Sequence, residues 1–258
     1  MSTVTVAVAD GIATVTLDRP EVANTMDLAF GHDFHAAALA VSTDAAVRAV
    51  VLTGAGKAFS FGGDLRGMVA SGGNAEAYLR ELTSHLHAGL AILARMNAPV
   101  IAAVNGTAAG AGVGLVLAAD LAIAAQSAKV SLAYTGVGLT PDGATSFLLP
   151  RAVGHKRAME LLLTNRTLSA DECLQWGLVN QVVADEELPA VVGKLAARLA
   201  AGPTQAFGDT KRLMLASAGP LESQLSLESQ TIALRGSSAE GREGIAAFLE
   251  KRKPGYPR

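Results

Sequence analysis

The sequence predicts an α/β protein, and three observations support this fold class. Strand-like and helix-like segments alternate through the middle of the chain, with connections long enough to join parallel strands. Beyond residue 133 the pattern is helical. The 258 residues, 50% of them hydrophobic, can close one large core, since a chain of this size buries roughly 70–75% of its unfolded surface.

The first half of the chain is expected to open with a β-hairpin. Two β-branched runs, residues 3–8 and 12–17, flank Asp10-Gly11, a dipeptide that favours the positive φ angles of a tight turn. A helix is predicted from Asp27, which is placed to cap it, to about residue 41. The later elements of this half are a helix at residues 75–96 and strands at residues 49–53, 100–104, 121–124 and 129–133.

Helices are expected to dominate the second half. Ser169 and Glu172 have the spacing of a capping box, in which both side chains satisfy free backbone N–H groups, and Gly177 is placed to end that helix. The apolar faces of the later helices need a sheet or a neighbouring subunit to pack against. These helices are predicted at residues 186–201, 204–216, 221–234 and 238–251.

Composition and charge argue against several classes of protein. The 21 Lys and Arg against 23 Asp and Glu give a net charge of −2, which disfavours a nucleic-acid-binding surface. The single cysteine, Cys173, cannot form an internal disulfide, and the N-terminus lacks the pattern of a signal peptide, so a cytoplasmic location is expected. The apolar stretch at residues 98–125 contains Pro99, Asp120 and several glycines, which indicates a buried strand, turn and helix and no membrane span.

The histidines do not predict a metal site. His85 and His87 are two positions apart on a predicted helix and therefore point to different faces. His32 and His35 share a face, but no acidic and histidine cluster accompanies them. We interpret these side chains as surface or partly buried residues without a ligand role.

Two glycine-rich turns could bind a nucleotide, but each lacks part of the required motif. The Gly-Ala-Gly-Val-Gly at residues 110–114 lacks the third glycine and the later acidic residue of a dinucleotide-binding fingerprint, and the turn at residues 54–58 lacks the first glycine and the Ser or Thr of a phosphate loop. Such turns can instead present unscreened backbone N–H groups, as an oxyanion hole requires. Tight packing of turn against sheet is an equally good interpretation of each loop taken alone.

Considered together, the turns belong to longer motifs. Residues 57–65 read Lys-Ala-Phe-Ser-Phe-Gly-Gly-Asp-Leu, and residues 99–112 read Pro-Val-Ile-Ala-Ala-Val-Asn-Gly-Thr-Ala-Ala-Gly-Ala-Gly. This pair resembles the crotonase (enoyl-CoA hydratase/isomerase) superfamily. The resemblance continues, in the same order as in the family, at residues 17–20, Asn24, 168–170, 176–179 and 248–252.

The resemblance implies a crotonase-like ββα superhelix over residues 1–200 and a helical region over residues 201–258 that assembles a trimer or a dimer of trimers. It implies an acyl-CoA thioester as substrate and no metal, flavin or nicotinamide cofactor, since CoA is part of the substrate. By their motif positions, Gly63 and Ala111 are expected to supply the two oxyanion-hole N–H groups. The residues expected to bind substrate or CoA are Val22, Ala23, Ser60, Phe61, Gly62, Asp64, Leu65, Tyr134 and Leu139, with Phe248 and Lys251 reaching the CoA of a neighbouring subunit.

The resemblance also indicates a reaction. The two glutamates used by hydratases of this family fall at Gly114 and Tyr134, and neither can act as a carboxylate base. By itself, Asp142 is typical of a helix N-cap. Compared with members of the family, Pro-Asp-Gly at residues 141–143 resembles the acidic segment of enoyl-CoA isomerases, especially those that rearrange ring-epoxide CoA thioesters in phenylacetate breakdown.

Moving a double bond from position 3 to position 2 needs one acid–base group, and Asp142 is expected to be that group. An apolar pocket would make its carboxylate a stronger base. The alternatives are a hydratase or another crotonase reaction, and a non-catalytic binding protein with the same fold. The residues expected to wall the pocket are Phe61, Leu65, Tyr134, Val137 and Leu139.

Overall fold

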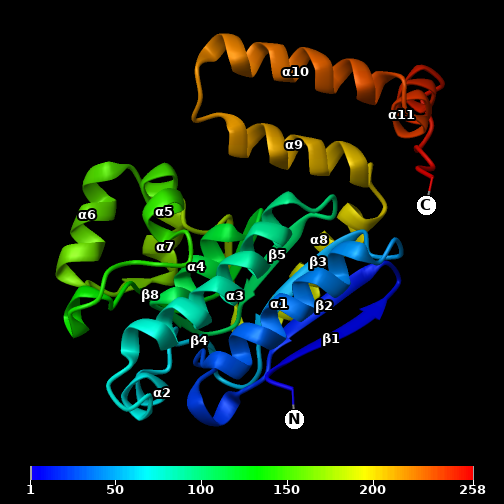
Figure 1. Cartoon of the computed structure of the whole chain (residues 1–258). Coiled ribbons are helices and arrows are strands. Elements are labelled where there is room, and N and C mark those ends of the chain that lie inside the picture. The colour runs from blue at the N-terminus through cyan, green and yellow to red at the C-terminus, as the bar shows by residue number, and fades with distance from the viewer. Residues whose placement is uncertain (1, 258) are drawn as a thin grey trace.

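The computed structural model describes residues 2–257 as two β-sheets surrounded by helices (Figure 1). The main sheet has six strands in the order β1-β2-β3-β5-β7-β10, and the smaller sheet has four in the order β4-β6-β8-β9. Only β1 and β2 of the main sheet pair antiparallel, so the predicted α/β class with parallel pairing is confirmed. The strands are β1 (Val4–Ala9), β2 (Ile12–Leu17), β3 (Ala49–Gly54), β4 (Ala58–Ser60), β5 (Val100–Val104), β6 (Thr107–Ala109), β7 (Leu121–Ala125), β8 (Lys129–Ser131), β9 (Leu168–Ser169) and β10 (Gln181–Val183).

A repeated ββα unit builds the molecule. Each of β3, β5 and β7 in the main sheet is followed within a few residues by β4, β6 or β8 in the smaller sheet. Helices α2 (Leu65–Ala70) and α3 (Ala75–Arg95) follow β4, and α4 (Ala111–Ala118) follows β6. The expected superhelix is therefore confirmed, and it places the ends of β4 and β6 next to each other at the start of α4.

The helices cover both faces of the main sheet. Helices α1 (Leu28–Thr43) and α3 enclose the larger core cluster, and α8 (Leu188–Ala200) closes a smaller one on the other face. Asp27 caps α1 as predicted, because its carboxylate accepts the Phe30 N–H at 2.8 Å. The rings of Phe30 and Phe34 on α1 are stacked in the larger cluster.

Local turn signals proved reliable. Asp10 and Gly11 have φ angles of 52° and 79° and join the strands of the predicted hairpin. Ser169 and Glu172 form the predicted capping box at the start of α7 (Ala170–Trp176), and Gly177 ends this helix in the left-handed conformation. Two further helices, α5 (Thr145–Val153) and α6 (His155–Thr164), precede α7.

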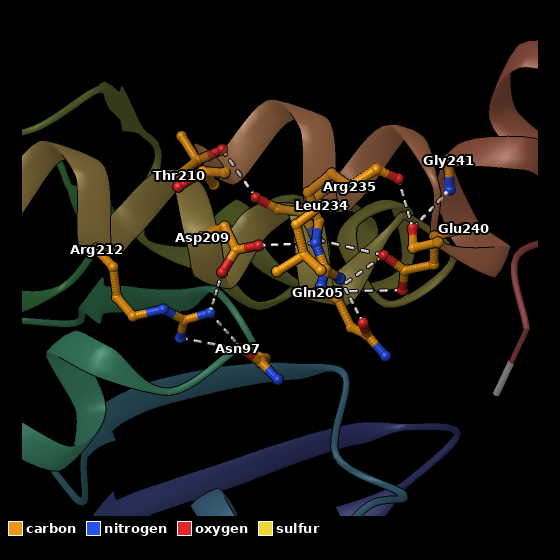
Figure 2. Close-up of polar contacts among 12 residues, drawn as sticks. Asn97, Gln205, Asp209, Thr210, Arg212, Leu234, Arg235, Glu240 and Gly241 are labelled. Carbon is orange, nitrogen blue, oxygen red and sulfur yellow. Dashed lines mark hydrogen bonds and ion pairs between the residues drawn. The ribbon is translucent and has the colours of Figure 1, made fainter. Parts of the chain in front are cut away.

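The C-terminal helices α9 (Thr204–Ala216), α10 (Leu221–Gly236) and α11 (Ala239–Leu249) form a group on one side of the sheet (Figure 1). Figure 2 shows that Asp209 on α9 lies between Arg212 and Arg235, with Arg235 contributed by α10. Glu240 on α11 accepts the N–H groups of Gln205 and the next residue, so it caps α9 from another helix. The domain boundary after residue 200 stays a prediction.

The apolar stretch at residues 98–125 is buried within the fold. It contributes β5, β6, α4 and β7, as the strand, turn and helix interpretation predicted. In the part of the chain that the structure describes, no helix is both long and apolar enough to cross a membrane.

Candidate active site

Two glycine-rich loops meet at the ends of β4 and β6. Gly62 follows β4 with a φ angle of 80°, and a Cβ atom at this residue would lie 2.7 Å from the Ala109 carbonyl oxygen and 2.8 Å from the Ala111 nitrogen. Only glycine allows the loops to approach so closely. This contact brings Gly63 and Ala111, which are far apart in sequence, to the same place.

Buried polar side chains fix the first loop. Asn24 is fully buried, and its amide nitrogen donates to the carbonyl oxygens of Ala58 and Phe59. The Ser60 hydroxyl donates to the Asn24 carbonyl and accepts the N–H of Gly62. Ser60 is fully buried and its hydroxyl is used inside the loop, so its expected part in substrate binding would fall to its backbone and stays a prediction.

The two backbone N–H groups expected to form an oxyanion hole have no acceptor among residues 2–257. On either side of Gly63 the backbone is hydrogen-bonded to Met26: the Gly62 carbonyl accepts the Met26 N–H, and the Asp64 N–H donates to the Met26 carbonyl. The N–H of Gly63 itself has no such partner. Ala111 is the first residue of α4, where the N–H has no partner within the helix. Two unpaired donors at the positive end of a helix form a setting that stabilises an anionic oxygen.

The Asp142 turn packs directly on the first turns of α4. A Cβ atom at Gly114 would overlap the Gly143 carbonyl oxygen, and a Cβ atom at Gly143 would lie 3.8 Å from the Ala111 carbonyl oxygen. Asp142 is therefore placed beside Ala111 and does not act as a helix cap. Ala144, with no side-chain cap, precedes α5, so the N-cap interpretation of Asp142 is wrong.

Tyr134 and Asp142 form a hydrogen-bonded pair. The Tyr134 hydroxyl donates to Asp142 Oδ1 at 2.7 Å. Burial, followed by the charge of Asp142, raises the pKa of Tyr134 above its ordinary value, so the phenol keeps its proton. Tyr134 is only 8% exposed, in keeping with its expected role as a pocket wall.

The expected apolar pocket is open in the single chain. The Asp142 side chain is 28% exposed, and Phe61, Leu65 and Val137 are about half exposed. Enclosure of the carboxylate therefore needs the substrate or a neighbouring subunit.

His87 belongs to this cluster, and sequence reasoning missed it. Its Nε2 accepts the N–H of Gly143 at 3.1 Å and lies 3.9 Å from Asp142 Oδ2. Sequence spacing could not reveal this role, because His87 is 55 residues from Asp142 and only the packing of α3 against the Asp142 turn brings them together. His85, on the same helix, packs instead against His32 of α1.

Two of the residues expected to bind CoA lie at a cavity of about 390 Å³ beside the first loop. Ala23 and Phe61 line it, and so does Lys57, an exposed cation that the sequence analysis did not assign. A cation beside an apolar cavity suits the phosphates of a nucleotide. The cavity is lined by Pro20, Ala23, Gly56, Lys57, Ala58, Phe61 and Thr107.

Of the remaining residues expected to bind substrate or CoA, four lie near the two loops and two lie in the C-terminal region. Asp64 caps α2 and lies 3.7 Å from the Arg19 guanidinium, so its carboxylate already has partners. Phe248 is on α11 and Lys251 follows that helix, and Figure 1 shows α11 far from α2. Their expected role concerns a neighbouring subunit, and it stays a prediction. The others lie near the loops: Val22 ends the 3-10 helix η1 (Pro20–Val22), Leu65 begins α2, and Leu139 follows the 3-10 helix η2 (Thr135–Val137).

Another cleft, of about 480 Å³, lies between the N-terminal hairpin and α8. Asp10 is its one ionisable residue, so it offers no pair of groups for acid–base chemistry. Among residues 2–257, no three His, Cys, Asp or Glu side chains are grouped to hold a metal ion.

A ββα spiral in which two glycine-rich loops present unpaired backbone amides at the start of a helix is the arrangement of the crotonase class of proteins. The model of the Enoyl-CoA hydratase/isomerase family matches residues 7–258, and the chain belongs to this family of enzymes, which act on acyl-CoA substrates. The family resemblance in the sequence is thereby confirmed.

Named relatives span nearly the whole chain. A "Probable enoyl-CoA hydratase" of Rhodobacter capsulatus is 43% identical over 98% of this chain and 97% of its own. The 1,2-epoxyphenylacetyl-CoA isomerase of Escherichia coli is 40% identical over 95% of each chain. A 4-chlorobenzoyl coenzyme A dehalogenase of Arthrobacter is 38% identical over 94% of this chain and 88% of its own. The crystal structure of an enoyl-CoA hydratase from Polaromonas matches with a TM-score of 0.93 and 33% identity over 98% of this chain and 99% of that one.

Proposed function

We propose that the protein is an acyl-CoA double-bond isomerase, which converts a 3-enoyl-CoA or a ring-derived acyl-CoA into the 2-enoyl-CoA. The observation that carries this proposal is the contact between Gly114 and Gly143. The Asp142 turn fills the space where a glutamate side chain at residue 114 would begin. This contact sets the Asp142 turn beside Ala111 and supports a site with one carboxylate, and isomerisation needs only one.

The chemistry follows from these positions. The thioester oxygen would accept the N–H groups of Gly63 and Ala111, which acidifies the C2 protons. Asp142 removes a C2 proton, and the electrons spread over the oxygen, C2 and C4 as a dienolate. The protonated Asp142 then returns the proton to C4, so the double bond moves to position 2 and the carboxylate is regenerated. Each amide donor contributes about 2.7–4 kcal/mol to lowering such a barrier.

A direct assay tests the proposal. Purified protein is expected to convert 3-enoyl-CoA into 2-enoyl-CoA, and Asp142→Asn is expected to lower kcat at least about a hundredfold because the amide cannot take a proton. Asp171→Asn, an exposed aspartate on α7, is the matched control and should keep full activity. Full turnover by Asp142→Asn, or none by the wild type, contradicts the proposal.

Hydration of a 2-enoyl-CoA is the competing reaction within the family. The name of the Rhodobacter relative favours it, whereas the absence of a carboxylate at Gly114 and Tyr134 argues against it. The rates of the two reactions on a matched pair of C6 substrates decide between them. A faster hydration than isomerisation would reverse our assignment.

A second candidate is hydrolytic replacement of a ring halide in an aroyl-CoA, the reaction that the Arthrobacter relative's name describes. The observation that favours it is His87 beside Asp142, because a carboxylate nucleophile and a base for water are the groups such a substitution needs. Against it, Nε2 of His87 is already an acceptor for the Gly143 N–H. Chloride release from 4-chlorobenzoyl-CoA tests this candidate.

Assembly into a trimer or a dimer of trimers is part of the proposal. The support is the apolar surface of the C-terminal helices, where Leu221, Ile232 and Phe248 are more than half exposed. In such an assembly, Phe248 and Lys251 of one subunit would reach the CoA of the next. The single buried thiol suits a reducing compartment, and the cytoplasm stays our prediction.

A further inference from the structure

We propose that Tyr134 and His87 are positioning residues that hold Asp142 at two points and leave Oδ2 as the only oxygen able to move a proton. This inference rests on the isomerase function proposed above. The physical reason is that a carboxylate that takes a proton from C2 and returns it to C4 must keep one orientation throughout the reaction.

Tyr134 fixes the first point. Its hydroxyl donates to Oδ1 at 2.7 Å, from a side chain buried in the larger core cluster. A donor that keeps its own proton stabilises the ionised carboxylate and occupies one of its two oxygens. The other oxygen, Oδ2, has no hydrogen bond among residues 2–257 and remains free for substrate.

His87 fixes the second point through the backbone. Because Nε2 accepts the Gly143 N–H at 3.1 Å, this arrangement requires the Nδ1–H tautomer of the imidazole. The bond ties α3 to the turn that carries Asp142. A proton on Nε2 would remove this acceptor and place a positive charge 3.9 Å from Oδ2, which would make the Asp142 carboxylate a weaker base.

Few other groups face the carboxylate. Backbone of Gly114 on α4 packs under the turn, and the buried Thr145 hydroxyl of α5 lies beside Tyr134. Among residues 2–257, Tyr134 and His87 are the titratable side chains in contact with Asp142. These two side chains are therefore the ones that can orient the carboxylate.

Three variants assayed on 3-enoyl-CoA test the His87 side of this two-point attachment of Asp142, which we call the clamp. His87→Ala is expected to lower kcat about tenfold with a KM change below about threefold, because the base is misplaced and binding is retained. His87→Gln should stay within about threefold of wild type, since its Oε1 can take the place of Nε2 as acceptor. His85→Ala, the same substitution two residues away and facing α1, is the matched control and should match wild type.

The pH profile supplies a reading that a purely structural role would not change. In Tyr134→Phe, the acid limb of kcat/KM should move to higher pH, because the ionised carboxylate loses a hydrogen-bond donor. In His87→Gln the acid limb should stay as in wild type, because the Tyr134 donor is retained. Wild-type kinetics in His87→Ala, or an unchanged acid limb in Tyr134→Phe, overturns the clamp.

A measurement independent of activity separates this inference from the proposed function. In protein labelled with 15N-histidine, the His87 ring should show the Nδ1–H tautomer, assigned by comparison with His87→Gln. The Gly143 amide proton should shift in His87→Ala and stay unchanged in His85→Ala. The Nε2–H tautomer or an unmoved Gly143 signal overturns the clamp even in an active isomerase, whereas inactivity on 3-enoyl-CoA with the expected spectra overturns only the proposed function.

Discussion

At the scale of single residues, Gly114 sets how closely the Asp142 turn approaches α4. A methyl group there would overlap the Gly143 carbonyl oxygen, so Gly114→Ala is expected to destabilise the protein by about 1–3 kcal/mol and to displace Asp142. Urea unfolding and the isomerase assay measure the two effects. Gly193→Ala on α8, where a Cβ atom meets nothing within 4 Å, should instead raise stability by about 0.5–1 kcal/mol. Equal effects of the two substitutions would contradict the packing argument.

Cys173 gives a second prediction at this scale. Burial, with a smaller effect from Glu172, raises the pKa of its thiol to about 12. Because the thiolate is the reactive form, the native protein should not react with a thiol reagent at pH 8, and urea should expose one reactive thiol per chain. The unfolded thiol ionises first, near 9, so the contribution of Cys173 to stability falls as pH rises from about 9 to 12. Rapid labelling without urea would contradict this account.

At the scale of elements, an ion pair between the buried Lys211 and the partly exposed Asp120 fastens α9 to the sheet. Lys211 Nζ lies 2.8 Å from Asp120 Oδ2 and donates to the carbonyl oxygens of Leu93 and Ala98. Burial lowers the pKa of Lys211 and raises that of Asp120, in each case against the effect of the partner's charge. The pair therefore depends on its bonds to the backbone, which include the Val100 N–H on Asp120.

Breaking this pair from one side should be costly. Lys211→Met leaves Asp120 without its partner, and a loss of about 3–5 kcal/mol in the free energy of unfolding is expected. The double variant with Asp120→Asn should recover part of that loss, because no unpaired charge remains. Urea unfolding measures both, and Lys194→Met on the exposed face of α8 is the matched control. A loss no larger than that of the control would show that the pair does not anchor α9.

At the scale of the whole molecule, the C-terminal helices carry several large apolar side chains that are more than half exposed, and a cluster of such side chains marks an interaction surface. Leu225 on α10 is 54% exposed, and Leu39 on α1 is 51% exposed. Leu225→Asp is expected to shift the protein toward the 26.2 kDa single chain, whereas Leu39→Asp should leave three or six times that mass, as measured by light scattering. Identical masses for the two variants would place the interface elsewhere.

Loss of assembly should also affect catalysis if a neighbouring subunit completes the CoA site. Phe248 and Lys251 lie outside the cavity at Lys57 in their own chain. The Leu225→Asp variant should therefore show a raised KM for the acyl-CoA with a smaller change in kcat. An unchanged KM in a dissociated protein would contradict the shared site.

Local sequence determined the elements and their ends. The Asp10-Gly11 turn, the Asp27 cap and the Ser169–Glu172 box depend on contacts within a few residues, so pattern alone predicted them. The strands β4, β6, β9 and β10 escaped prediction, the last two in a half expected to be helical, because two or three residues carry no period and these strands exist only through pairing with distant strands.

Motif positions brought attention to Gly63, Ala111 and Asp142, but only the tertiary structure decided how they are held. Three close contacts join residues that are far apart in the sequence: Gly62 with Ala111, Gly114 with Gly143, and His87 with the Asp142 turn. Each contact depends on the packing of separate elements. Such contacts follow from how the spiral brings loops and helices together in space, and no local propensity or spacing encodes them.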